Sequence, residues 1–277
     1  MPTPFNHIVL AQRLLDGDRL PNPIRARLNR SRASFLLGNT APDVSAFVGA
    51  PRAATHFFEV PLRNPIPAHR RLLGSHPELA AVDQLAPDHA AFIAGYLSHL
   101  WLDQAWIQQV FEPYFGPDVG RGRFRERLVA HNLLRAHLDL QDRDRIPEGV
   151  GAVLRSTQPD DWLPFADDKQ LRRWRDHLAS QVEPGGHIRT VEVFADRLDV
   201  PLERFKRRLH SEEEMQHAVF DHIPEDLIAD FRHRGLTYTA ELIHYYLDRD
   251  LQEAPNVNRS LDLRSTAPTP STSGRGS

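Results

Sequence analysis

The stretch from residue 88 to about residue 112 constrains the fold more than any other part of the sequence. Apolar side chains, including Phe92, Leu97, Trp101 and Trp106, occur on every face of a helix drawn through it. A helix that is hydrophobic all round must be surrounded by other elements. The stretch therefore predicts a central helix with neighbours on all sides.

Other segments have helical spacing with apolar and charged faces, and no segment alternates as a strand would. We expect a first helix that begins at Asn6 and a second from residue 23 to a Gly-Asn turn at 38 and 39. Later helices are expected within 124–141, 168–182, 190–199, 201–220 and 225–251. The prediction is an all-α, single-domain helical bundle over residues 1–253. Residues 254–277 are rich in serine, threonine, proline and glycine and predict a disordered tail.

Composition restricts the chemistry. The 277 residues include no cysteine, so any metal must be bound by nitrogen and oxygen, for which 15 histidines are present. The formal net charge of -3 gives no general attraction to nucleic acid or to an anionic membrane. No apolar run predicts a membrane span and the first residues do not resemble a secretion signal, so we expect a cytoplasmic protein.

Two polar residues interrupt the apolar central helix, in "GYLSHLWLDQAW" at residues 95 to 106. His99 and Asp103 are four residues apart, which places them on one face of the helix. An ionised carboxylate is very costly to bury unless a cation, a donor or a metal meets it. Either the two side chains hydrogen-bond each other or a loop, or they belong to a metal site.

Three further residues of ligand type occur in the first part of the chain. His7 lies at the start of the first helix, Asp43 follows the Gly-Asn turn in "LGNTAPD", and His56 lies in "ATHFFEV" within a proline-rich loop. Taken singly, His7 is explained as an exposed residue, Asp43 as a helix cap and His56 as a loop residue packed on phenylalanine.

Taken in order, these five residues follow a pattern that resembles the zinc-dependent phospholipase C family. That family has a glycan-anchor phospholipase D branch and is related to single-strand-specific zinc nucleases. The similarity covers about the first 110 residues and is most specific in "GYLSH-x3-D-x2-W" and in "G-x3-PD" followed by "TH-F". It implies an all-α bundle with up to three zinc ions at one end of its helices.

The resemblance also implies roles for individual residues. His7, His56, His99 and Asp103 match metal ligands, Asp103 as a carboxylate that bridges two ions. Asp43 matches a carboxylate that acts as a ligand or as the general base. Because zinc lowers the pKa of bound water to about 7, the expected reaction is attack of a metal-bound hydroxide on a phosphodiester.

Other ligands of the family are missing. Ile107 follows Trp106 where related sequences continue towards a further histidine. On the next helix His131 is followed one turn later by Arg135, so the expected histidine and carboxylate pair is not reproduced. His131 is either a further metal ligand or a polar contact between helices, and Asp139 is expected to be solvated. These departures predict one or two zinc ions and not a complete set of three.

The predicted function is thus a phospholipase C-like phosphoric diester hydrolase that acts on a phospholipid or another small phosphodiester. The alternative is a non-catalytic scaffold of the same fold with a reduced metal site or none. Nuclease action is disfavoured by the net negative charge and because no basic, aromatic-lined groove is evident in the sequence, so no nucleic acid partner is expected. The sequence does not predict an oligomeric state.

Overall fold

The structure is a computed structural model that describes residues 1–64 and 66–248, and within these ranges every regular element is helical. In chain order the helices are α1 (Pro4–Asp16), α2 (Asn22–Arg30), α3 (Arg32–Gly38), α4 (Val44–Val48), α5 (Ala53–His56), α6 (Ala68–Ser75), α7 (Pro87–Trp106), α8 (Glu112–Phe115), α9 (Phe124–Arg143), α10 (Val150–Ser156), α11 (Asp168–Val182), α12 (Thr190–Arg197), α13 (Leu202–His210), α14 (Glu212–Ala218) and α15 (Leu227–Leu247). The all-α prediction is confirmed. The predicted tail from residue 254 lies outside the described residues.

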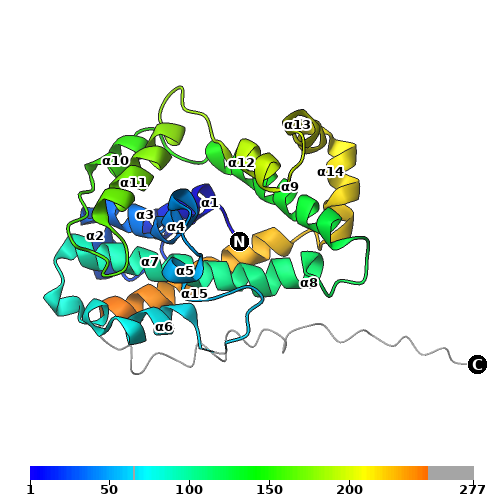
Figure 1. The fold of residues 1–277 in the computed structure, drawn as a ribbon. Helices are drawn as coiled ribbons and strands as arrows, with labels where there is room; N and C mark the ends of the chain where they lie inside the picture. Colours follow the sequence, from blue (N-terminus) through cyan, green and yellow to red (C-terminus); the bar gives the residue numbers. More distant parts are fainter. Residues whose placement is uncertain (65, 249–277) are drawn as a thin grey trace, which may run out of the picture.

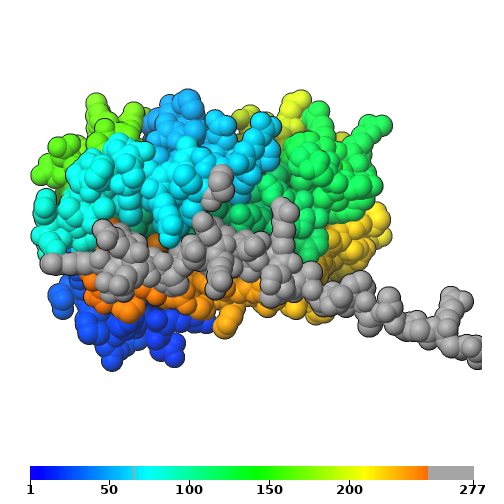
Figure 2. Space-filling model, turned by 90° about the horizontal axis from the view of Figure 1, so that it is seen from below, coloured from blue at the N-terminus to red at the C-terminus, as the bar shows by residue number. Residues whose placement is uncertain are grey.

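Helix α7 is the central helix that the sequence predicts. It runs through the middle of the molecule beside α15, and α3, α6 and α2 also pack on it (Figure 1). Every residue from Ala90 to Trp106 is buried. Seen from below, α15 (orange) forms part of the surface next to the N-terminal helices (blue) (Figure 2). The all-round apolar character of α7 therefore reflects neighbours on every side.

Helix α3 approaches α7 closely at two glycines. A Cβ added to Gly38 of α3 would lie 2.0 Å from the carbonyl oxygen of Phe92 on α7. Gly95 of α7 faces α3 in the same way. The absence of side chains at these points lets the two backbones touch, which fixes the position of the segment that follows α3.

Several boundaries differ from the predicted ones. Helix α1 begins at Pro4, because Thr3 is its cap and accepts a hydrogen bond from the Asn6 backbone N–H at 3.4 Å. Asn6 lies inside the helix and donates from its side chain to the buried carboxylate of Asp142 at 2.7 Å. Arg232 of α15 also donates to Asp142 at 2.7 Å, so this polar group links α1, α9 and α15. The asparagine therefore serves tertiary packing and not capping.

Two predicted helices are each divided in two. The second breaks at Ser31 into α2 and α3, and the segment 201–220 breaks at Ser211 into α13 and α14. Ser211 accepts a hydrogen bond from the Glu214 backbone N–H, as serine often does at a helix start. Helix α7 continues after Trp106 as a π-helical turn, Ile107–Phe111. Within the described residues no helix has the length and apolar content required to cross a bilayer.

His69 of α6 is expected to make the stability of the fold depend on pH. It is buried, and burial followed by the charge of Arg70 lowers the pKa of His69 from 6.5 to about 3. The unfolded chain thus binds a proton that the folded chain does not, and stability falls as the pH falls through this window. Lowering the pH from 7 to 5 is expected to cost about 2 kcal/mol at this residue.

Urea unfolding at both pH values, in the presence of a chelator, measures this effect. His69→Asn is expected to remove about 2 kcal/mol of the pH dependence, and His217→Asn, at an exposed histidine, is the control. An equal pH dependence in the wild type and in His69→Asn would contradict the assignment.

Candidate metal centre

Five side chains from four segments meet next to the middle of α7. We call them the His/Asp cluster: His7 from α1, Asp43 from the short 3₁₀ turn Ala41–Asp43, His56 from the end of α5, and His99 and Asp103 from α7. His99 and Asp103 lie on one face as predicted, with 3.4 Å between His99 Nε2 and Asp103 Oδ2. The cluster thus brings together five of the six residues selected from the sequence.

The cluster consists of two overlapping groups of three. His7, His99 and Asp103 form one group, and Asp43, His56 and His99 form the other; in each group the candidate ligand atoms all lie within 4.8 Å of one another. His56 Nε2 lies 3.4 Å from Asp43 Oδ1 and 3.5 Å from Asp103 Oδ2. Imidazole and carboxylate in such groups are the usual nitrogen and oxygen ligands of zinc.

Hydrogen bonds outside the cluster determine which ring nitrogens face into it. His99 Nδ1 donates to the Asn39 carbonyl at 2.8 Å. His56 Nδ1 donates to the Thr55 hydroxyl at 3.1 Å, because that hydroxyl itself donates to the Pro42 carbonyl at 2.7 Å. Partners of this kind fix the tautomer of metal-binding histidines. Both rings therefore present Nε2 to the interior of the cluster.

The positions of these two Nε2 atoms indicate whether a cation fits in the cluster. The Nε2 atoms of His56 and His99 are 3.3 Å apart, and carboxylate oxygens surround them. If both rings are neutral, two lone pairs face each other and no hydrogen bond joins them. His7 Nδ1 is also buried without a hydrogen-bond partner among the described residues. A proton or a metal ion between these atoms removes the repulsion, so the donor set fits a bound zinc ion.

The pKa values of His7 and His56 favour the neutral rings that bind metal ions. Burial, and then the charge of His99, lowers the pKa of His7 to about 4. Burial, and then the charge of Arg52, lowers the pKa of His56 to about 4. Both rings are therefore neutral at pH 7, which is the form that binds metal. Burial acts to lower the pKa of His99 too, but the charge of Asp103 and a hydrogen bond to it raise it overall.

Arg52 is a member of the site that the sequence pattern did not indicate. Its guanidinium donates to Asp103 Oδ2, and its Nη1 lies 3.9 Å from Asp43 Oδ1. Burial acts to raise the pKa of Asp103, but the charges of His99 and Arg52 hold it well below its usual range. Arg52 lies one helical turn before His56 in the sequence, and that spacing is the signal that would have identified it.

His131 lies outside both groups of the cluster. Its Nε2 accepts a hydrogen bond of 2.9 Å from Trp106 Nε1, which joins α9 to α7. Of the two alternatives for His131, a metal ligand or a polar contact between helices, the structure shows the polar contact. Burial, followed by nearby positive charge that includes Arg135, lowers the pKa of His131 well below its usual value.

The expectation that Asp139 is solvated is wrong. Its carboxyl is buried and accepts hydrogen bonds from the hydroxyls of Thr3 and Thr190. Burial raises the pKa of Asp139 to about 7, although both hydroxyls lower it. Helical spacing along α9 did not indicate this burial, because the residues that cover Asp139 belong to the N-terminus and to α12.

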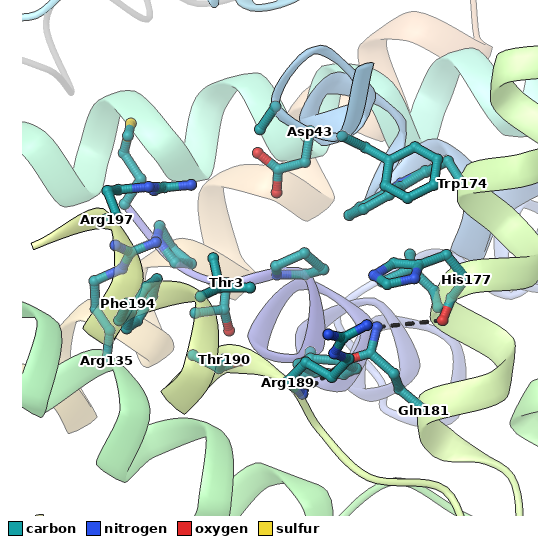
Figure 3. Close-up of a pocket in the computed structure, with 18 of the residues that line it drawn as sticks. Thr3, Asp43, Arg135, Trp174, His177, Gln181, Arg189, Thr190, Phe194 and Arg197 are labelled. Carbon is teal, nitrogen blue, oxygen red and sulfur yellow. Dashed lines mark hydrogen bonds between the residues drawn. The ribbon is translucent and has the colours of Figure 1, made fainter. Parts of the chain in front are cut away.

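A cavity of about 390 Å³ borders the His/Asp cluster. Asp43 and Arg52 are among its lining residues, and Asp43 points into it from the segment before α4 (Figure 3). The side chain of Asp43 is 17% exposed, whereas His56, His99 and His7 are fully buried. A small molecule in this cavity therefore reaches the cluster from the side of Asp43.

In comparisons with known proteins, no family model, no curated protein and no solved structure matches the chain.

Proposed function

We propose that the protein is a metal-dependent phosphodiester hydrolase resembling zinc-dependent phospholipase C, with one or two zinc ions in the His/Asp cluster. The observation that carries the proposal is the pair of buried ligand groups that share His99, in which two imidazole Nε2 atoms oppose each other at 3.3 Å. With both rings neutral such an arrangement is costly, and a cation between the two nitrogens removes the cost.

In this proposal the residues of the cluster have different roles in holding the metal ion. Bound zinc supplies Lewis acidity, which lowers the pKa of water and neutralises phosphate oxygens. His7, His56 and His99 would hold the ion, His99 after it gives up the proton that Asp103 favours, and the carbonyl of Asn39 and the hydroxyl of Thr55 hold the rings of His99 and His56 in position. Asp103 contacts all three rings, so it would be the carboxylate ligand next to each of them.

Asp43 is better suited as a ligand than as the general base. Although burial acts to raise its pKa, a hydrogen bond with His56 and the charge of His99 lower it overall. A carboxylate with a lowered pKa takes up a proton poorly at neutral pH. Arg52 faces the same cavity, and its guanidinium matches the geometry of a phosphate with two parallel donors. We assign Arg52 to hold the phosphodiester next to Asp43.

A metal-free scaffold of the same fold is the second candidate, and Arg52 favours it. The guanidinium of Arg52 contacts both carboxylates of the cluster, so it supplies a compensating cation without any metal. On this alternative, the purified protein holds no zinc and its melting temperature does not change when a chelator is added.

Hydrolysis of bis(p-nitrophenyl) phosphate, with zinc or manganese added to chelator-treated protein, tests the proposal. Metal-stimulated turnover is expected, and Asp43→Asn is expected to reduce it at least ~100-fold, because the loss of a ligand has an effect of this size. Elemental analysis of the same samples gives the zinc content.

Asp118→Asn is the matched control, since Asp118 is an exposed loop residue. It is expected to leave both turnover and zinc content unchanged. A wild-type protein that is folded, lacks zinc and shows no metal-stimulated turnover overturns the proposal and leaves the scaffold.

A further inference from the structure

The cavity beside the His/Asp cluster is strongly basic. Its lining includes Arg52, Arg135, Arg189 and Arg197, whereas Asp43 is the sole carboxylate among the lining residues. We call it the arginine cavity. It lies among the first residues of the chain, α4, α9, α11 and α12, which are far apart in sequence.

The cations of the arginine cavity are largely uncompensated. Arg52 is paired with the carboxylates of the cluster. Within residues 1–64 and 66–248, by contrast, Arg135, Arg189 and Arg197 form no ion pair. Figure 3 shows Arg135 and Arg197 together on one side of the cavity, across from Trp174 and His177. Like charges gathered without a partner are unfavourable unless an anion binds between them.

Arg135 carries the strongest sign of a missing ligand. Its Nε is buried and has no hydrogen-bond partner among the described residues, while its Nη1 donates to Asn132 at 3.0 Å. Its guanidinium stacks on the ring of Phe194 at 4.4 Å, which holds it in place. Burial, and then the charge of Arg197, lowers the pKa of Arg135 to about 10, so the side chain remains a cation at neutral pH.

The nearest acidic group on α9 does not neutralise Arg135. Asp139 lies one helical turn further on and is bound by the hydroxyls of Thr3 and Thr190. Burial raises the pKa of Asp139 to about 7, so this carboxyl is only partly ionised at neutral pH. The guanidinium therefore keeps an unsatisfied positive charge next to an open cavity.

We propose that Arg135 and Arg197 form an anion site that binds a second phosphate group of the substrate, separate from the phosphodiester that is hydrolysed. The assignment to the substrate rests on the proposed function; anion binding itself does not. Arginine binds phosphate with N–H donors, and Arg135, which stacks on Phe194, has Nη2 without a hydrogen-bond partner among the described residues. A cavity of about 390 Å³ is in the range of sites for small molecules, and Asp43 and Arg52 line the same space.

Isothermal titration of the metal-free protein with inorganic phosphate tests the anion site without any turnover. Arg135→Gln is expected to weaken phosphate binding at least ~10-fold, as the loss of a charged hydrogen-bond donor does. Arg197→Gln is expected to weaken phosphate binding about 3-fold, because Arg197 is exposed and charges near water contribute less. Arg207→Gln, at an exposed residue of α13 that does not line the cavity, is the control and leaves binding unchanged.

A second titration separates a substrate phosphate from free phosphate. Glycerophosphoinositol 4-phosphate is expected to bind at least ~10-fold more tightly than glycerophosphoinositol, and Arg135→Gln removes the difference. Equal binding of the two diesters, with phosphate still bound, overturns the assignment to the substrate. No binding of phosphate, or binding that both cavity variants leave unchanged, overturns the site. If circular dichroism shows that Arg135→Gln does not fold, phosphate binding by Arg197→Gln tests the anion site instead.

Discussion

Replacement of Asp103 by asparagine is expected to lower the affinity for zinc by more than ~100-fold and to abolish metal-stimulated hydrolysis. Asp103 contacts His7, His56 and His99 at 3.3 to 3.5 Å, so it contacts every histidine of the two ligand groups, which share His99. Even outer partners of ligands contribute about 10- to 100-fold to metal affinity, and a shared ligand contributes more. Asparagine keeps the shape of the side chain and removes its charge.

Competition with a chromogenic zinc chelator measures the affinity, and turnover of bis(p-nitrophenyl) phosphate measures the activity. Asp118→Asn serves as the control again, because it removes one carboxylate of the same kind from the surface. Zinc affinity within about threefold of the wild type in Asp103→Asn would remove the metal centre from the proposal. In the scaffold alternative the substitution only destabilises the fold, since it leaves Arg52 and His99 without their buried partner.

Replacement of Gly95 by alanine is expected to destabilise the protein by about 3 kcal/mol or more. The added Cβ would lie 2.3 Å from the carbonyl oxygen of Phe35 and 2.9 Å from the backbone nitrogen of Asn39. These are backbone atoms of the neighbouring segment, so α3 and α7 must move apart, which costs as much as severe overpacking. The carbonyl of Asn39 accepts from His99 Nδ1, so the same movement disturbs the His/Asp cluster.

Thermal unfolding measures the stability, with an expected decrease of about 6 °C or more in the melting temperature. Gly74→Ala is the matched control, because no atom lies within 4 Å of a Cβ added at this position in α6. It is expected to raise stability by about 0.5 to 1 kcal/mol, as alanine does in a helix. Similar stabilities for the two variants would show that α3 and α7 do not touch as described.

The sequence predicted the elements of the fold better than their ends. The central helix was found because apolar residues occur all round it, and α11 has the predicted bounds, Asp168–Val182. The start of α1 was placed at Asn6, since asparagine is a common cap, but Thr3 holds that role. Asn6 instead meets Asp142, 136 residues further along the chain, and no local pattern contains that contact.

For the candidate site too, the sequence predicted features that depend on local spacing better than features that depend on long-range contacts. The spacing of His99 and Asp103 fixes a shared face, because the helix repeats every 3.6 residues. The sequence also identified His7, Asp43 and His56 as residues of ligand type, and the structure brings all three to that face. The sequence analysis also placed His131 among the candidate ligands, but in the structure His131 accepts a hydrogen bond from Trp106.

What the sequence determined by itself is therefore the helical fold, the buried α7 and the shared face of His99 and Asp103, since these depend on residues a few positions apart. The tertiary structure alone decided that Arg52 meets both carboxylates, that Asp139 is buried, and that Arg135 and Arg197 line one cavity. These features depend on helices distant in sequence, whose relative positions follow from packing such as the contact of Gly38 and Gly95 between α3 and α7. A side chain's charge can be read from the sequence, but its partner is set by which helices touch.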